Sequence, residues 1–297
     1  MLPWLEPARQ QLAALLSTNQ LAHAILLTGP AGIGKSTLAS YLTDALLCTA
    51  VQRPCGRCKS CLLRQAGNHP DLLVLDSSAN SIGVDAVRQL SQFLHGSAQQ
   101  QANKVVLLLQ AEKLTEPAAN ALLKTLEEPP QHSFIILTTA GAETLPATVL
   151  SRCQKWPLAA QYTDAAQQWL VQQTNRAVPD FLLAYSAGAP LKALQLVETG
   201  AADKLQHGLH SLQQYIDSAL PLADCVKQLE AITELTPLLG WFLRQQLLPA
   251  LLGKEPARLL ALHQLFSRWC RDEKQILGQN KQLALTTMLS SLKRLSR

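Results

Sequence analysis

Residues 29–36 read Gly-Pro-Ala-Gly-Ile-Gly-Lys-Ser, which is the G-x-x-x-x-G-K-S spacing of a phosphate-binding loop. A short apolar run, residues 24–28, precedes this loop, and an amphipathic stretch, residues 37–47, follows it. In such a strand–loop–helix unit, glycines let backbone N–H groups surround a phosphate, and the lysine reaches the terminal phosphates. The residues expected to bind nucleotide are Gly29, Gly32, Gly34, Lys35, Ser36 and Thr37.

The strand expected to lie beside this loop lacks the acids that phosphoryl transfer uses. Residues 104–109 are an apolar run, and Gln110 follows them. Mg²⁺ prefers carboxylate and hydroxyl oxygens, and the attacking water needs a group that orients it. Ser36 offers a hydroxyl, whereas Leu109 and Gln110 offer no carboxylate. We therefore expect ATP or ADP to fit the loop with poor support for Mg²⁺, and hydrolysis by this chain to be weak or absent.

The wider pattern predicts an α/β domain followed by helices. Short apolar runs alternate with amphipathic stretches through the first 160 residues, which favours a parallel sheet covered by helices on both faces. Strands are predicted at 24–28, 72–75, 104–109, 134–137 and 154–158, and helices at 37–47, 84–95 and 115–126. Three short helices are expected after Trp156-Pro157, at 164–172, 179–186 and 190–197. Longer helices are expected at 205–216, 224–232, 237–252, 256–274 and 282–295.

These patterns predict three domains. They are a nucleotide-binding-type domain over 1–160, a small helical lid over 161–202 and an all-α domain over 203–297. The length of 297 residues exceeds what one hydrophobic core usually covers, and 47% apolar with 16% charged residues fits a folded, mainly helical protein.

Charge and hydropathy argue against two classes of protein, namely dedicated DNA-binding proteins and membrane or exported proteins. The net charge of +5 permits transient contact with nucleic acid, but no dense run of Lys and Arg marks a DNA-binding surface. The first residues lack the basic and apolar regions of a signal peptide, and no apolar run has membrane-spanning length. A cytoplasmic location is therefore expected.

Four of the seven cysteines are crowded into 14 residues, in the pattern Cys48-x6-Cys55-x2-Cys58-x2-Cys61. Pro54 and Gly56 allow tight turns between them. Four thiolates at this spacing are typical of a closed, tetrahedral zinc site, which leaves no coordination position for catalytic water. The sequence predicts a structural Zn²⁺ that stabilises an insertion after the first crossover helix.

Several longer motifs carry a family resemblance. The stretch 120–130 reads Asn-Ala-Leu-Leu-Lys-Thr-Leu-Glu-Glu-Pro-Pro, and Phe134 to Thr139 and Ser151-Arg152-Cys153 follow it. With Gly67-Asn68-His69-Pro70-Asp71 and residues 83–88, these motifs closely resemble AAA+ clamp-loader subunits of bacterial DNA polymerase III. The resemblance is detailed from about residue 20 to 160 and only architectural beyond.

The resemblance implies a RecA-like AAA+ domain, a lid and a helical collar. It also implies a hetero-pentameric ring that contains tau- or gamma-like ATPase subunits and a delta-like subunit. The ring would act on a sliding clamp and primed DNA, and no membrane partner is expected. The chain would then belong to a nucleotidyltransferase complex without being an independent ATPase. Arg152, in Ser-Arg-Cys, would act as an arginine finger in a neighbouring subunit's nucleotide site.

The same resemblance exposes two departures. The family's ATPase subunits carry Asp and Glu where this chain has Leu109 and Gln110, and a sensor arginine where Leu191 follows Gly188-Ala189-Pro190. Thr138 and Thr139 resemble the sensor position at the end of a strand. The favoured interpretation is a ring member that supports the assembly and donates Arg152.

Two alternatives remain at this level. The first is an active ATPase motor subunit of the same ring, although Glu112, the nearby acid, is expected on a solvated face. The second is a zinc-dependent nucleic-acid-binding module with a vestigial phosphate loop, which would use Arg53, Arg57, Lys59 and Arg64 around the cysteines. The absence of interleaved aromatic residues weighs against the second.

Overall fold

The computed structural model describes residues 2–76, 81–100, 103–252, 256–275 and 280–296. The chain divides into two compact units. The first contains residues 1–173 and 186–193, and the second contains residues 174–185 and 194–297. The predicted three-domain division, with a separate lid over 161–202, stays a prediction.

A five-stranded parallel sheet forms the centre of the first unit, with the strand order β2-β3-β4-β1-β5. The strands are β1 (Ala24–Thr28), β2 (Leu72–Leu75), β3 (Lys104–Leu108), β4 (Ser133–Thr139) and β5 (Gln154–Pro157). The predicted parallel α/β fold is thus confirmed, although β3 ends one residue earlier than predicted. The order places β1 between β4 and β5, so the loop that follows β1 begins at an interior strand of the sheet.

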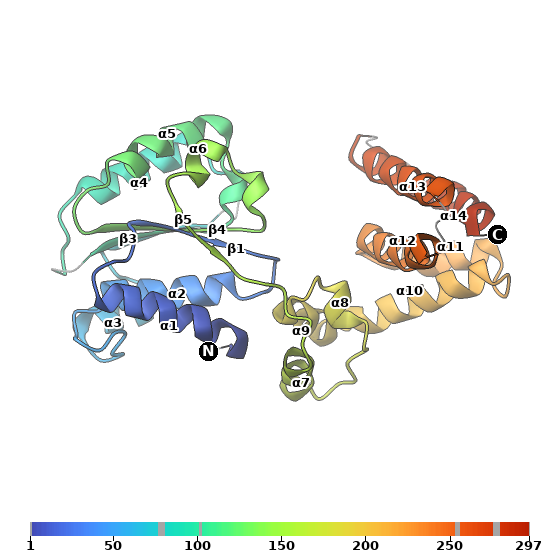
Figure 1. Ribbon diagram of the computed structural model, residues 1–297, viewed down its shortest axis with the longest axis horizontal. Helices are drawn as coiled ribbons and strands as arrows, with labels where there is room; N and C mark the ends of the chain where they lie inside the picture. The colour runs from blue at the N-terminus through green and yellow to red at the C-terminus, as the bar shows by residue number, and fades with distance from the viewer. Residues whose placement is uncertain (1, 77–80, 101–102, 253–255, 276–279, 297) are drawn as a thin grey trace. The chain divides into compact units, whose positions relative to one another are not determined.

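Helices cover both faces of this sheet (Figure 1). On one face lie α1 (Glu6–Ser17), α2 (Lys35–Leu47) and α3 (Lys59–Gln65), and on the other α4 (Val84–His95), α5 (Glu116–Glu127) and α6 (Ala147–Leu150). Strand side chains alternate between faces. Accordingly Ile25 and Leu27 pack with the core beneath α1 and α2, whereas Leu26 packs with the core beneath α4 and α5. The sequence prediction did not include α1 or α3.

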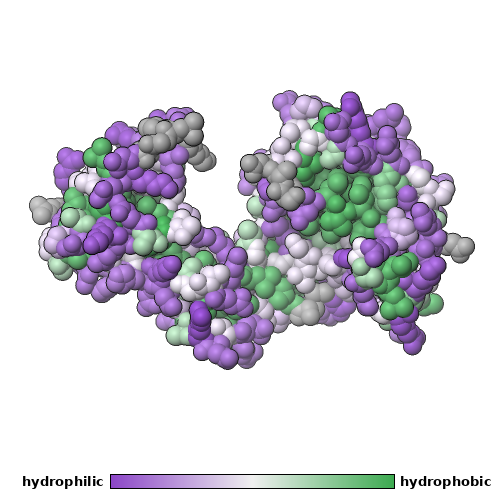
Figure 2. All heavy atoms as spheres, turned by 180° about the vertical axis from the view of Figure 1, so that it is seen from behind, coloured by the Kyte–Doolittle hydropathy of each residue, from purple (hydrophilic) through white to green (hydrophobic). Residues whose placement is uncertain are grey.

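The edge of the sheet at β2 is partly open. Val74 is 45% exposed there, and the other residues of this four-residue strand are half-buried. Figure 2 shows, from behind, a hydrophobic area on the first unit that hydrophilic residues border. Short edge strands offer few free backbone groups for pairing with another chain.

The remaining helices continue the chain through both units. They are α7 (Asp164–Gln173), α8 (Leu182–Tyr185), α9 (Pro190–Glu198), α10 (Ala201–Ile216), α11 (Leu222–Glu230), α12 (Leu235–Leu252), α13 (Pro256–Gln275) and α14 (Lys281–Ser296). The predicted mostly helical C-terminal part is confirmed, while α8 is shorter than the predicted helix 179–186. Within the described residues, no helix has both the length and the apolar character needed to span a bilayer.

Candidate functional site

The phosphate loop borders a cavity of about 320 Å³ at the carboxyl end of the sheet. The cavity brings together five of the predicted nucleotide-binding residues with residues from four other segments. Its lining includes Gly32, Gly34, Lys35, Ser36, Thr37, Asp76, Leu109, Gln110, Glu112, Thr138, Thr139 and Leu191. Ligands of α/β sheets bind in this position, beyond the carboxyl ends of the strands.

The loop itself holds the lysine side chain. Lys35 Nζ donates hydrogen bonds to the carbonyl oxygens of Gly29, at 2.6 Å, and Pro30, at 3.0 Å. Burial lowers the pKa of Lys35, while the nearby carboxylate of Glu112 acts in the opposite direction. A phosphate in the cavity would compete with these two carbonyl groups for the ammonium.

The first turn of α9 sits directly against the loop. The N–H of Leu191 donates to the carbonyl oxygen of Gly32 at 3.0 Å. Gly32 has a φ of +83°, and a Cβ there would lie 2.6 Å from the backbone nitrogen of Lys192. Glycine is needed because both its backbone conformation and this close approach exclude a side chain. Leu191 thereby reaches the cavity without supplying a cation.

The end of β3 closes another side of the cavity. Leu109 and Gln110 both line it, at the positions where the resemblance implies acids. Gln110 adopts a left-handed backbone, with φ 55° and ψ 57°, and its N–H donates to Thr138 Oγ1 at 3.1 Å. A non-glycine residue in this conformation carries about 1–3 kcal/mol of strain. The lining thus keeps the sensor-like threonine but lacks the two carboxylates.

Two acids reach the cavity from elsewhere, and the expectation for one of them is wrong. Glu112 was expected on a solvated face, yet it is half-buried and lines the cavity. Its Oε2 atom is buried without a hydrogen-bond partner among the described residues. Asp76, which sequence reasoning missed, follows β2 and also lines the cavity. The signal that could have found it is its position directly after a parallel strand. The phosphate loop also follows the carboxyl end of a strand, so the two segments lie at the same end of the sheet.

Arg152 lies outside this cavity, in the turn after α6, and is held by several contacts. Its Nε donates to Glu127 Oε1 at 2.8 Å, and its Nη2 also bonds that oxygen. Its Nη1 donates to the carbonyl oxygen of Thr148 at 2.8 Å and to Ser151 Oγ at 3.2 Å. The Arg152 side chain is 33% exposed. The neighbouring Cys153 is buried, and burial raises its thiol pKa to about 11.

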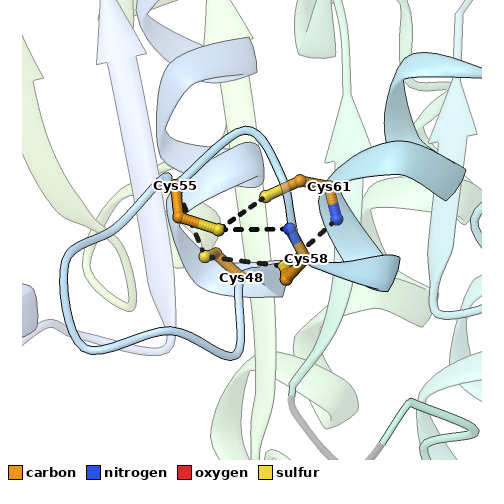
Figure 3. A group of neighbouring side chains, drawn as sticks. All are labelled: Cys48, Cys55, Cys58 and Cys61. Atoms are coloured by element: carbon orange, nitrogen blue, oxygen red, sulfur yellow. Dashed lines mark hydrogen bonds between the residues drawn. The ribbon is translucent and has the colours of Figure 1, made fainter.

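The four clustered cysteines converge at the far end of α2 (Figure 3). Cys48 follows the last residue of α2, and Cys61 lies in the first turn of α3. The four sulfurs lie within 4.8 Å of one another, with Cys48 and Cys58 sulfurs 3.9 Å apart and Cys55 and Cys61 sulfurs 4.0 Å apart. Tetrahedral Zn–S bonds of about 2.3 Å require sulfur separations of roughly 3.8 Å. The donor set therefore fits one Zn²⁺.

The chemistry of the sulfurs also suits a cation. Backbone N–H groups of Arg57 and Cys58 lower the pKa of Cys55, whereas burial among the other sulfurs raises the pKa of Cys61 to about 12. Complete deprotonation of the set therefore needs a positive charge at its centre, which Zn²⁺ supplies. Arg64 pairs with Asp44 of α2 at 3.0 Å, so one of the basic residues considered for nucleic-acid contact is already engaged.

A buried polar chain connects this cysteine module to β2. Ser60 Oγ lies 2.6 Å from His69 Nε2 and donates to the carbonyl oxygen of Leu47 at 2.6 Å. The N–H of Asp71 donates to His69 Nδ1 at 3.1 Å. His69 Nε2 therefore carries the proton and donates to Ser60. This arrangement resembles a Ser-His-Asp triad only in residue types, because the serine hydroxyl already donates to a carbonyl group and the aspartate contributes its N–H.

The comparisons with known proteins agree with these features. The family described as "DNA polymerase III, delta subunit" matches residues 4–161. DNA polymerase III subunit delta' of Haemophilus influenzae is 37% identical over 224 residues, which cover 74% of this chain and 68% of that protein. The corresponding subunit of Yersinia pestis is 44% identical over 207 residues, which cover 66% of this chain and 61% of that protein.

The chain belongs to the delta-prime family of DNA polymerase III subunits. About a third of the Haemophilus influenzae relative and about two fifths of the Yersinia pestis relative lie outside the aligned regions. A solved structure of a DNA polymerase III gamma subunit-related protein from Thermotoga maritima covers 99% of this chain and all of its own, with a TM-score of 0.51. At 19% identity, this structural similarity shows only that the two proteins share a fold.

Substitution of Gly32 should reveal the contact between the loop and α9. We expect Gly32→Ala to lower the free energy of unfolding more than Gly67→Ala, because both glycines have positive φ but only Gly32 abuts a backbone atom. The left-handed backbone alone costs about 1–2 kcal/mol for alanine. Urea denaturation of both variants measures the difference, and equal losses would contradict the contact.

Zinc content should depend on the four clustered thiols. The protein purified under reducing conditions should contain about one Zn²⁺ per chain, and Cys58→Ser should remove most of it. Metal analysis by mass spectrometry measures both values. Cys225→Ser provides the matched control, because Cys225 is a buried thiol outside the cluster. Wild-type zinc content in Cys58→Ser would contradict the predicted site.

Protonation of His69 should destabilise the first unit. Burial lowers its pKa below the ordinary 6.5; Asp71 opposes this shift, and Arg64 adds to it. The stability contribution is complete above pH 6.5, where folded and unfolded states are both neutral. It is lost as the pH falls from about 6.5 through the folded pKa. Urea denaturation between pH 5 and 8 should show a steeper decline for wild type than for His69→Gln. Parallel curves would contradict this role.

Proposed function

We propose that this chain is a supporting subunit of a clamp-loader ring of DNA polymerase III. In this role it packs in a hetero-pentamer with tau- or gamma-like ATPase subunits and a delta-like subunit, and it helps the ring load a sliding clamp onto primed DNA. Membership of the delta-prime family supports this proposal. The proposed location is the cytoplasm.

Its own ATP turnover is weak or absent. The observation that carries this proposal is the cavity lining, which combines Lys35 and Ser36 with Leu109 and Gln110. The loop offers the positive charge and backbone donors that a phosphate needs, so ATP or ADP can bind. Hydrolysis also requires a ligand that fixes Mg²⁺ and a group that orients water, and neither Leu109 nor Gln110 supplies a carboxylate.

Arg152 acts in a neighbouring subunit. Its position after α6, outside the chain's own cavity, and its partial exposure support a contact with another subunit. A guanidinium next to a transferred phosphoryl group stabilises the charge that develops there. Zn²⁺, held by Cys48, Cys55, Cys58 and Cys61, has a structural role and takes no part in ATP turnover.

One observation favours a second candidate, an active ATPase subunit. Glu112 and Asp76 line the cavity, and Glu112 has a buried oxygen without a hydrogen-bond partner among the described residues. Either carboxylate would have to substitute for the acids absent at positions 109 and 110. This candidate requires Lys35 for turnover, whereas the proposed function does not.

Turnover of the reconstituted ring separates the two functions. Arg152→Ala should lower ATP hydrolysis at the neighbouring site by on the order of 10³-fold, because an arginine finger contributes at least that much in related chemistry. The ATP hydrolysis rate of the whole ring should fall by the fraction that this neighbouring site contributes. Lys35→Ala should leave the DNA- and clamp-stimulated rate unchanged.

The control is Arg88→Ala, which removes another exposed arginine with an acidic partner. Loss of turnover with Lys35→Ala but not with Arg152→Ala would establish the active ATPase instead. Loss with neither variant would refute the arginine finger.

A further inference from the structure

The ion pair of Arg152 with Glu127 joins two separate elements. Glu127 is the last residue of α5, whereas Arg152 follows α6. The carboxylate oxygen Oε1 accepts from both Nε and Nη2 of Arg152. Buried residues such as Leu122 and Leu126 anchor α5 in the core. The backbone that carries the Glu127 carboxylate is therefore fixed in position. The acid thus fixes the direction of a long side chain that has many rotamers in solution.

The contacts use two different edges of the guanidinium. Glu127 takes the side edge, which consists of Nε and Nη2, while Thr148 and Ser151 accept from Nη1. A guanidinium is planar and has five N–H donors in fixed directions. To bind two phosphate oxygens end-on, through Nη1 and Nη2, Arg152 must release its Nη1 contacts. It can keep the bond from Nε to Glu127 while it does so.

We propose that Glu127 is the positioning residue for Arg152. It holds the side edge of the guanidinium so that the end edge meets a phosphate of the nucleotide bound by the adjoining subunit. This inference rests on the proposed arginine finger. Glu127 leaves the second N–H of Nη2 and both N–H groups of Nη1 for other acceptors, because its oxygen accepts only from Nε and from one N–H of Nη2.

The energetics of the pair agree with a positioning role. The side chains of Arg152 and Glu127 are 33% and 50% exposed, so water and salt screen their attraction. Charge-assisted bonds from arginine to phosphate are stronger than the neutral contacts to Thr148 and Ser151. Phosphate can therefore replace those neutral contacts, while the carboxylate continues to restrict the rotation of the guanidinium.

The test measures kcat and KM for ATP in the complete reconstituted ring, with DNA and clamp present. Glu127→Ala should lower turnover at the adjoining site about two- to five-fold, the range expected for an exposed ion pair, and leave KM unchanged. The kcat of the whole ring should therefore fall by less than it does with Arg152→Ala. Glu127→Gln should fall between wild type and Glu127→Ala, because its amide oxygen still accepts from Nε. Glu128→Gln is the matched control, since it removes the adjacent, exposed acid.

Two further measurements exclude a purely structural effect. The thermal midpoint of Glu127→Ala should equal that of Glu128→Gln. In a chain that already carries Arg152→Ala, Glu127→Ala should cause no additional loss of kcat. An additive loss would overturn the proposal, because Glu127 would then act without Arg152.

The remaining outcomes are decisive as well. Turnover of Glu127→Ala at or above the wild-type rate, with Arg152→Ala impaired, overturns the positioning role but leaves the arginine finger intact. Normal turnover of Arg152→Ala refutes the finger and Glu127's role together.

Discussion

Helix α2 determines the relative positions of the two candidate sites in the first unit. Lys35 is its first residue, and Cys48 directly follows its last residue. Its 13 residues span about 20 Å, and Leu38, Leu42 and Leu46 are fully buried against the sheet. Each such leucine contributes about 1.5–3 kcal/mol through burial. The packed helix therefore holds the phosphate loop at one end and the cysteine cluster at the other.

The cysteine module in turn braces the far end of this helix. Arg64 pairs with Asp44, and Ser60 donates to the carbonyl oxygen of Leu47, in the last turn of α2. The carbonyl groups of a last helical turn have no partner within the helix, so the Ser60 hydroxyl satisfies a group that would otherwise need water. Zinc coordination would tighten the same region, because Cys48 belongs to the ligand set. The cysteine cluster and the cavity at the phosphate loop thus share one packed helix.

Under the proposed function, the cavity at the phosphate loop and Arg152 make separate electrostatic contributions to phosphoryl transfer. The cavity retains Lys35 and the N-terminal end of α2, which favour an anion, but Leu109, Gln110 and Leu191 contribute no charge to it. Arg152 carries its charge outside that cavity, on a turn tied to α5 through Glu127. A subunit built in this way can bind phosphate in one place and stabilise a transition state in another, as the proposed ring requires.

The amino-acid sequence by itself determined the features that depend on local pattern. The phosphate loop, the five strands, the four-cysteine spacing and the replacement of acids by Leu109 and Gln110 could all be predicted, because each is a property of neighbouring residues. The family could be inferred for the same reason, since its motifs are continuous stretches.

Only the tertiary structure decided which distant side chains meet. Glu112 and Asp76 reach the cavity because β2 and β3 are adjacent and end at the same edge of the sheet. Glu127 meets Arg152 because α5 packs beside α6, and Ser60 meets His69 because α3 folds back against the chain that enters β2. Such pairs follow from strand order and helix packing, and long-range packing of this kind leaves no periodic signal in the sequence.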